Sequence, residues 1–153
     1  MKILAASECH FEQVAKLVAT AEELYTISPS ATFPWDEEQI RQIAKVRSNL
    51  SVCTIDDAVV GFGNLYNIRR CESAFIGNII VSGEHAGRGI GSALVKYLSD
   101  ICINDYQATP RLSVFNFNTR ALLLYTKLGF MPYQVEPRCK PSGETVALVH
   151  MSL

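Results

Sequence analysis

Hydrophobic and polar residues alternate along this chain with two different periods, and the period predicts the secondary structure of each segment. Runs of apolar or β-branched residues indicate strands, whereas apolar residues three or four positions apart indicate amphipathic helices. The predicted strands cover residues 2–6, 51–55, 58–67, 73–81, 111–117, 131–138 and 145–152. The predicted helices cover residues 8–25, 37–46, 89–104 and 119–128. This order predicts a single α+β domain over residues 1–153, with a mixed central sheet of about seven strands flanked by about four helices.

Local residue types support several of these boundaries. Asp36 is a typical helix N-cap, and Gln39 lies where a capping box places its second member. The dipeptide Asp56-Asp57 between two strands predicts a tight hairpin. Gly61 and Gly63 weaken the strand that contains them, which indicates a bulge or a close neighbour.

Composition and charge exclude several classes of protein. The 153 residues are 48% hydrophobic and 19% charged, as in a globular domain, and the net charge is −1 without a basic cluster. We therefore expect no nucleic-acid partner, and no membrane contact, since no apolar run approaches the roughly 18 residues that cross a bilayer. The five cysteines, at positions 9, 53, 71, 102 and 139, fit neither a disulfide framework nor a zinc motif. Free thiols, most of them in the core, predict a cytoplasmic location.

A glycine-rich segment at 86–92 follows the apolar run 79–81 and precedes helical spacing over 94–102. Backbone N–H groups are unpaired where a helix begins, and the positive end of the helix dipole lies there. Glycine also allows a positive φ and the close approach of an anion. We therefore predict a turn that binds phosphate or diphosphate, with an ordinary tight turn as the alternative. The chain has no Gly-Lys-Ser/Thr tripeptide, and the even glycine spacing differs from the dinucleotide fingerprint Gly-x-Gly-x-x-Gly.

Two segments about 30 residues apart resemble the two signatures of the GNAT acetyltransferases. The first resemblance, to Arg/Gln-x-x-Gly-x-Gly/Ala, lies in Ala86-Gly87-Arg88-Gly89-Ile90-Gly91, where Ala86 replaces the Arg or Gln of the family. The second resemblance, to Asn-x-x-Ala-x-x-x-Tyr-x-x-x-Gly-Phe, lies in the segment from Asn118 to Phe130. The predicted order of elements is similar to that of the family over nearly the whole chain.

The resemblance implies an acetyl-CoA-dependent N-acetyltransferase that acts on a primary amine, either a small amine or a peptide or protein lysine. The implied acetyl-CoA (coenzyme A) contacts are Ile79, Ile80, Val81, Ala86, Gly87, Arg88, Gly89, Ile90, Gly91, Ser92, Asn118 and Ala121. One alternative is a non-catalytic acyl-CoA-binding regulatory module, which the substitution at Ala86 favours. Another is a phosphate-loop nucleotide hydrolase. The oligomeric state stays open between monomer and homodimer.

Tyr125 is the predicted general acid. It lies seven residues after Asn118, so both side chains point to one side of the predicted helix, and the small Ala121 between them leaves room for a ligand. A tyrosine hydroxyl can donate a proton to a departing thiolate; the alternative is a ring packed in the core. The general base is left open. Glu72, Glu84, His85 and Glu136 fit by residue type, and a water oriented by Asn78 is a further alternative.

The predicted contacts of the acceptor amine are Phe33, Trp35, Tyr66 and Asn78. Aromatic walls suit an apolar or cationic acceptor. The alternative for Phe33 and Trp35 is that they fill the core between two helices. No metal site is predicted, and no cysteine is accompanied by the His–Asp arrangement of a nucleophile.

Overall fold

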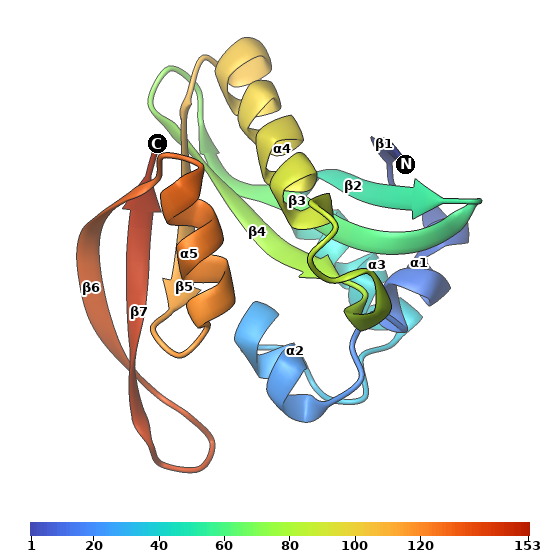
Figure 1. The fold of residues 1–153 in the computed structure, drawn as a ribbon, viewed down its shortest axis with the longest axis horizontal. Helices are drawn as coiled ribbons and strands as arrows, with labels where there is room; N and C mark the ends of the chain where they lie inside the picture. The colour runs from blue at the N-terminus through green and yellow to red at the C-terminus, as the bar shows by residue number, and fades with distance from the viewer.

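The computed structural model describes residues 1–153 as a seven-stranded sheet with helices on both faces (Figure 1). Its strands are β1 (Lys2–Ala5), β2 (Ser48–Ile55), β3 (Ala58–Arg69), β4 (Ser73–Val81), β5 (Thr109–Phe115), β6 (Met131–Cys139) and β7 (Thr145–Ser152). Its helices are α1 (Glu8–Ala15), α2 (Ala21–Ile27), α3 (Glu37–Val46), α4 (Ile90–Tyr106) and α5 (Thr119–Lys127), with a 3₁₀ turn at Gly83–His85. None of the helices is long and apolar enough to cross a bilayer. The predicted α+β class and mixed sheet are confirmed.

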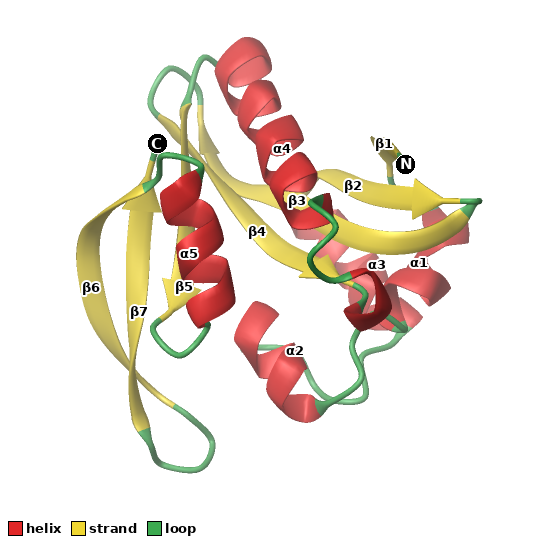
Figure 2. Cartoon of the chain, viewed as in Figure 1, coloured by secondary structure: helices red, strands yellow, loops and turns green.

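The sheet opens between its two central strands. The strand order is β1-β2-β3-β4-β5-β7-β6, and each neighbouring pair is antiparallel except β4 and β5, which are parallel. These two strands pair only from Ser73 opposite Thr109 to Ile76 opposite Leu112. Beyond that point they diverge, so the edge of β4 that faces β5 has no strand partner (Figure 2). We call this gap in strand pairing the opening, and its narrow end the apex.

The helices divide between the two faces of the sheet. We call the face under α4 and α5 the front face and the face under α1 and α3 the back face (Figure 1). The front core includes Leu112, Val114 and Tyr125. The back core includes Trp35 and Phe62. The short helix α2 lies beside the free end of β4, so it borders the opening.

One predicted helix is two helices in the structure. The segment 8–25 contains both α1 and α2, so the chain has five helices rather than four. Thr20 starts the second helix, because its side chain accepts a hydrogen bond from the Glu23 amide at 3.1 Å, and the Glu23 carboxylate accepts one from the Ala19 amide at 2.7 Å. Such reciprocal capping favours a new helix start over a continuous helix. The predicted cap of α3 is confirmed, since Asp36 accepts from the Gln39 amide at 2.9 Å.

The predicted hairpin and bulge are both present. Asp56 and Asp57 have φ of 48° and 64°, as a tight two-residue hairpin turn requires. The pairing of β3 with β4 shifts its register at Gly63, opposite Asn78, which has φ of 50°. An ideal Cβ at Gly63 would lie 2.6 Å from Ile79 Cδ1, so a larger residue there would displace the Ile79 side chain. The bulge therefore lies on β4 where the opening begins.

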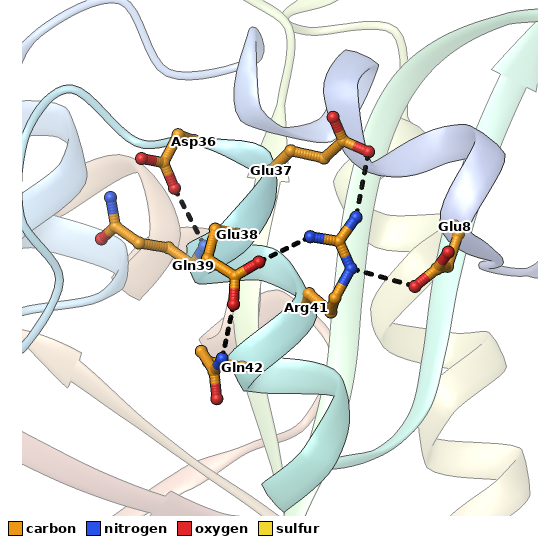
Figure 3. A network of polar contacts seen from close by, with 7 residues as sticks. All are labelled: Glu8, Asp36, Glu37, Glu38, Gln39, Arg41 and Gln42. Carbon is orange, nitrogen blue, oxygen red and sulfur yellow. Dashed lines mark hydrogen bonds and ion pairs between the residues drawn. The ribbon is translucent and has the colours of Figure 1, made fainter.

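A polar cluster at the surface links α1 to α3 (Figure 3). Arg41 of α3 donates to Glu8 of α1 at 3.0 Å, and to Glu37 and Glu38 of its own helix at 3.3 and 2.7 Å. The carboxylates are exposed, so water competes with each ion pair. The cluster therefore contributes little to the stability of the fold.

The cysteines are all free thiols, but the prediction that most of them lie in the core is wrong. Cys53 and Cys102 are buried, whereas Cys9, Cys71 and Cys139 are exposed. The exposed three lie in the first turn of α1, in the turn before β4 and at the end of the edge strand β6, where little packs over them. Burial raises the pKa of Cys102 to about 11, which keeps this thiol protonated and unreactive at neutral pH.

Candidate active site

The glycine turn between β4 and α4 presents a row of unpaired amides. Gly87 and Gly89 both have φ of 80°, a conformation that glycine adopts at little cost. The amide of Ala86 still bonds within the turn, to the Gly83 carbonyl at 3.3 Å. The six amides at 87–92 have no acceptor within the protein. The free amides therefore begin one residue later than the resemblance implies.

The surroundings of this turn favour an anion. It lies at the N-terminus of the 17-residue helix α4, where the helix dipole places partial positive charge. The first turn of α4 contains no acidic residue, and Arg88 is exposed beside it. An ideal Cβ at Gly87 or Gly89 would meet no atom within 4 Å, so the turn is open to a ligand. This arrangement can bind a phosphate or a diphosphate.

The packing of Gly91 brings the glycine turn, β4 and α5 together. An ideal Cβ at Gly91 would lie 3.3 Å from Leu124 Cδ2 and 3.7 Å from Val81 Cγ2. The two sequence segments that resemble family signatures therefore meet where α4 begins. Figure 1 shows α4 over β3 and β4, and α5 over β5, with the opening between the two strands that they cover.

The free edge of β4 leads from the apex to the glycine turn. Residues 77–81 pair with β3 along one edge and have no partner along the other. Ile79, Ile80 and Val81, the predicted backbone contacts, all lie in this segment. An extended, amide-rich chain can add to such an edge as a further strand.

Tyr125 lies in the front core beneath α5. Its side chain is 7% exposed, and its ring meets Phe130 edge-on with the ring centroids 6.2 Å apart. Burial raises the pKa of Tyr125 to about 12, so the phenol keeps its proton at neutral pH. The hydroxyl has no hydrogen-bond partner in the protein, yet it is not sealed from solvent. Such a hydroxyl can donate a proton to a ligand atom.

Asn118 and Ala121 shape the start of α5. Asn118 is the N-cap, because its Oδ1 accepts a hydrogen bond from the Ala121 amide at 3.3 Å. Ala121 is half-buried against the front core. The helix ends before Gly129, which has the predicted left-handed conformation with φ of 95°.

A chain of hydrogen bonds joins α2 to β4 beside the opening. Arg47 Nη1 donates to Asn64 Oδ1 at 3.0 Å, and Asn64 Nδ2 donates to Asn78 Oδ1 at 2.8 Å. Asn78 Nδ2 then donates to the Ile27 carbonyl at 2.9 Å. The Arg47 guanidinium also lies 4.3 Å from the centre of the Tyr66 ring. The structure thus brings together two of the predicted acceptor contacts, Tyr66 and Asn78.

The other two predicted acceptor contacts lie elsewhere. Trp35 is 5% exposed in the back core, where its ring meets Phe62 edge-on with centroids 6.4 Å apart. This placement supports the alternative that Trp35 fills the core. Phe33 is 43% exposed in the loop between α2 and α3. Neither ring stacks on Tyr66, which packs against Phe75 instead.

The four candidate bases lie at three separate places. Glu72 directly precedes β4, and Glu84 and His85 lie in the 3₁₀ turn beyond the free end of that strand. Glu136, on β6, is in contact with His150, whose Nε2 lies 3.2 Å from the Glu136 Oε1 atom. No group of three His, Cys, Asp or Glu side chains is placed to hold a metal ion.

One polar contact on the back face was not predicted from the sequence. Ser113 Oγ lies 2.6 Å from His150 Nδ1, and the two residues are register partners on β5 and β7. Each is a polar residue between apolar ones, in Leu112-Ser113-Val114 and in Val149-His150-Met151. That interruption of an apolar strand is the sequence signal that indicates such positions.

A model of the acetyltransferase (GNAT) family matches residues 15–130, which is more than half of the chain. The chain belongs to the GNAT family. The matched region contains both GNAT signatures, up to and including Phe130.

Several known proteins are similar to this GNAT chain. The thialysine N-epsilon-acetyltransferase of Bos taurus is 32% identical over 74 residues. The match covers 46% of this chain and 44% of that protein, so the chain spans less than half the length of this curated relative. The structure of smu.2055 from Streptococcus mutans UA159 has a TM-score of 0.82 at 25% identity, over 100% of this chain and 98% of that one. An aminoglycoside 6'-N-acetyltransferase complexed with coenzyme A has a TM-score of 0.76 at 17% identity, over 100% and 96% of the chains. This last likeness shows the fold alone.

Proposed function

We propose that this GNAT protein is an acetyl-CoA-dependent N-acetyltransferase that acetylates a primary amine. The observation that carries the proposal is the meeting of three parts at Gly91: the unpaired amides of the glycine turn, the free edge of β4, and α5 with Tyr125. The aminoglycoside acetyltransferase, which has the same fold, was solved with coenzyme A, and this supports a coenzyme at the same place.

The glycine turn fits the diphosphate of the coenzyme. Its six amides have no acceptor in the protein, the space beside Gly87 and Gly89 is open, and a hydrogen bond to a charged group contributes roughly 1.5–3 kcal/mol. Arg88 is exposed at the turn and makes no ion pair with another residue, so its guanidinium is available for a phosphate oxygen. Ala86 cannot supply the side-chain contact of the usual Arg or Gln. The backbone therefore supplies most of the binding.

The free edge of β4 fits the pantetheine arm, which contains two amides. The backbone of Ile79, Ile80 and Val81 pairs with it as with an added strand. This edge leads from the diphosphate site to the apex of the opening.

Acetyl-CoA supplies the acetyl group as a thioester. The Tyr125 hydroxyl holds the proton that a departing thiolate needs, and its raised pKa keeps that proton in place at neutral pH. General acids of this kind typically contribute about 10²–10⁴-fold to the rate. Asn118 and Ala121 position the start of α5, with Ala121 small enough to leave space for the coenzyme.

The acceptor amine approaches from the back face. Tyr66 and Asn78 border the opening there, and Phe75, which packs against Tyr66, lines a cavity of about 460 Å³ on the paired part of β4. Phe75 and Arg111, which line the cavity, form the register pair directly before the last pair of β4 and β5. The cavity therefore lies close to the apex. Its mixture of charged and aromatic groups suits a polar acceptor, either a small amine or a lysine side chain.

Thiol release from acetyl-CoA tests the proposal. The acceptor panel contains thialysine, spermidine, an aminoglycoside and a lysine peptide, and the acetylated product is identified by mass spectrometry. We expect thiol release that depends on one of these amines. Binding of acetyl-CoA without transfer to any amine would support the alternative of an acyl-CoA-binding regulatory module.

A further inference from the structure

We propose that Ser113, His150 and Glu136 form a proton relay that takes the proton from the acceptor amine. The inference rests on the proposed acetyl transfer, because an amine must lose its charge before it attacks a thioester. Ser113 contacts the amine, whereas His150 and Glu136 are positioning residues that act through Ser113.

The three side chains are joined end to end. Ser113 Oγ lies 2.6 Å from His150 Nδ1, and His150 Nε2 lies 3.2 Å from Glu136 Oε1. In the proposed relay, Nε2, which faces the Glu136 carboxylate, carries the imidazole proton, and Nδ1 accepts from the Ser113 hydroxyl.

The relay lies at the apex of the opening, on the face opposite Tyr125. Ile76 and Leu112 form the last register pair of β4 and β5, so Ser113 is the first β5 residue beyond it. Leu112 and Tyr125 both belong to the front core, and neighbouring strand residues point to opposite faces. Ser113 therefore projects to the back face. The proton acceptor Ser113 and the acid Tyr125 therefore lie on opposite sides of the opening. Acetyl transfer requires this placement if the amine arrives from one side and the thiolate leaves on the other.

Several titratable and charged groups surround the relay. The titratable and charged groups that face it are Tyr133, Glu136 and Arg138 on β6, Arg111 on β5, and Tyr66 on β3 with Arg47 stacked on its ring. Of these, Glu136 contacts the imidazole, and its Oε1 atom lies 3.2 Å from His150 Nε2 and 2.6 Å from Arg138 Nη2. Arg111 stacks on Tyr133.

The surroundings also set the state of the neighbouring phenol and the route to water. Burial raises the pKa of Tyr66, and the smaller opposing effects of Ser113 and of the Arg47 charge do not reverse this. The side chains of His150 and Glu136 are 17% and 30% exposed. His150 can therefore return its proton to water after each turnover.

The protons balance over one cycle. The ammonium group gives one proton to Ser113 Oγ while the Ser113 hydroxyl gives its own proton to His150 Nδ1. The neutral amine forms the C–N bond, the C–S bond breaks with its electron pair on sulfur, and Tyr125 protonates the thiolate. The second proton lost by the nitrogen restores Tyr125, and His150 releases the first to water.

The test compares kcat/KM from pH 6 to 9 in the wild type, Ser113→Ala and His150→Ala. The substrates are acetyl-CoA with thialysine, spermidine and a lysine peptide in turn. We expect kcat/KM for the amine to fall about 10²-fold in both variants at neutral pH, with the KM for acetyl-CoA unchanged. In His150→Ala the acidic limb of the pH profile moves to higher pH, because it then depends only on the ionisation of the acceptor amine. Added imidazole restores part of the His150→Ala rate, which it would not do if His150 were merely structural.

Ser152→Ala is the matched control, because Ser152 lies two residues further along β7 and its hydroxyl contacts only the Leu153 carbonyl. Its rates stay at the wild-type level. Wild-type rates and pH profiles in both relay variants would overturn the relay. A His150→Ala variant with a low rate that imidazole does not restore, and with an unshifted acidic limb of its pH profile, would also overturn it. Neither result would contradict acetyl transfer itself. A wild type that acetylates none of the amines overturns the proposed function, and the relay with it. If circular dichroism shows that His150→Ala is unfolded, the Ser113→Ala variant alone tests the relay, because it removes only one oxygen atom.

Discussion

Replacing Gly89 by alanine separates the two roles of the glycine turn, which are its backbone conformation and its openness to a ligand. Gly89 has φ of 80°, and an added Cβ would meet no protein atom within 4 Å. Gly143, in the turn between β6 and β7, has φ of 89° and is equally open. Gly143→Ala is therefore a control that is matched in strain and remote from the site.

The magnitude follows from the backbone conformation. A residue with a Cβ loses roughly 1–2 kcal/mol in the left-handed region, and the lower entropy of unfolded alanine returns about 0.4–1 kcal/mol. Both variants should therefore lose about 1 kcal/mol of unfolding free energy, or about 2–4 °C in Tm for a chain of this size. Only Gly89→Ala places a methyl group among the free amides at 87–92. The loss of one charged hydrogen bond there, about 1.5–3 kcal/mol, corresponds to roughly 10- to 100-fold weaker coenzyme binding.

Differential scanning calorimetry measures the first effect and titration calorimetry with coenzyme A the second. We expect similar Tm values for the two variants and weaker binding in Gly89→Ala alone, with a larger loss in Gly89→Val. Unchanged affinity in a folded Gly89→Ala protein would refute the assignment of the diphosphate to this turn. A wild-type Tm in Gly143→Ala would refute the estimate of backbone strain.

Three other predictions concern the opening. Tyr125→Phe should lower kcat about 10²-fold or more and leave the Kd for acetyl-CoA largely unchanged; an unchanged kcat would show that Tyr125 is not the acid. Asn78→Ala should cost about 2–5 kcal/mol in urea unfolding, because it leaves the Asn64 amide and the Ile27 carbonyl without partners and places alanine at φ of 50°, which asparagine tolerates better. Asn78→Gly removes the Cβ and should cost about 1 kcal/mol less; equal losses would contradict the strain. Since burial raises the pKa of Tyr125 to about 12, unfolded chains ionise first above about pH 10, so stability falls from pH 10 to 12 and falls less in Tyr125→Phe; parallel curves would contradict this.

Local patterns predicted the part of the site that is continuous in sequence. The strand at 73–81, the glycine turn and the helix that holds Tyr125 were all predicted, because apolar spacing, glycine and caps act over a few residues. The order of these segments also predicted the mixed sheet. The break between α1 and α2 was missed because apolar spacing continues through it, although Thr20 and Glu23 form a capping pair.

Contacts between distant strands could not be predicted from one sequence. Ser113 and His150 are 37 residues apart, and only the register of β5 and β7 makes them partners. Asn78 was predicted as a contact of the acceptor, but its left-handed backbone and its bond to α2 depend on the bulge in β4. Aromatic character alone does not separate Trp35, which is buried, from the more exposed Phe33.

A crystal structure of the protein with coenzyme A tests the central claim most directly. We expect the diphosphate oxygens to accept hydrogen bonds from the amides at 87–92, and the sulfur to lie within hydrogen-bonding distance of the Tyr125 hydroxyl. A coenzyme bound away from the glycine turn, or a sulfur on the far side of the sheet from Tyr125, would contradict the account.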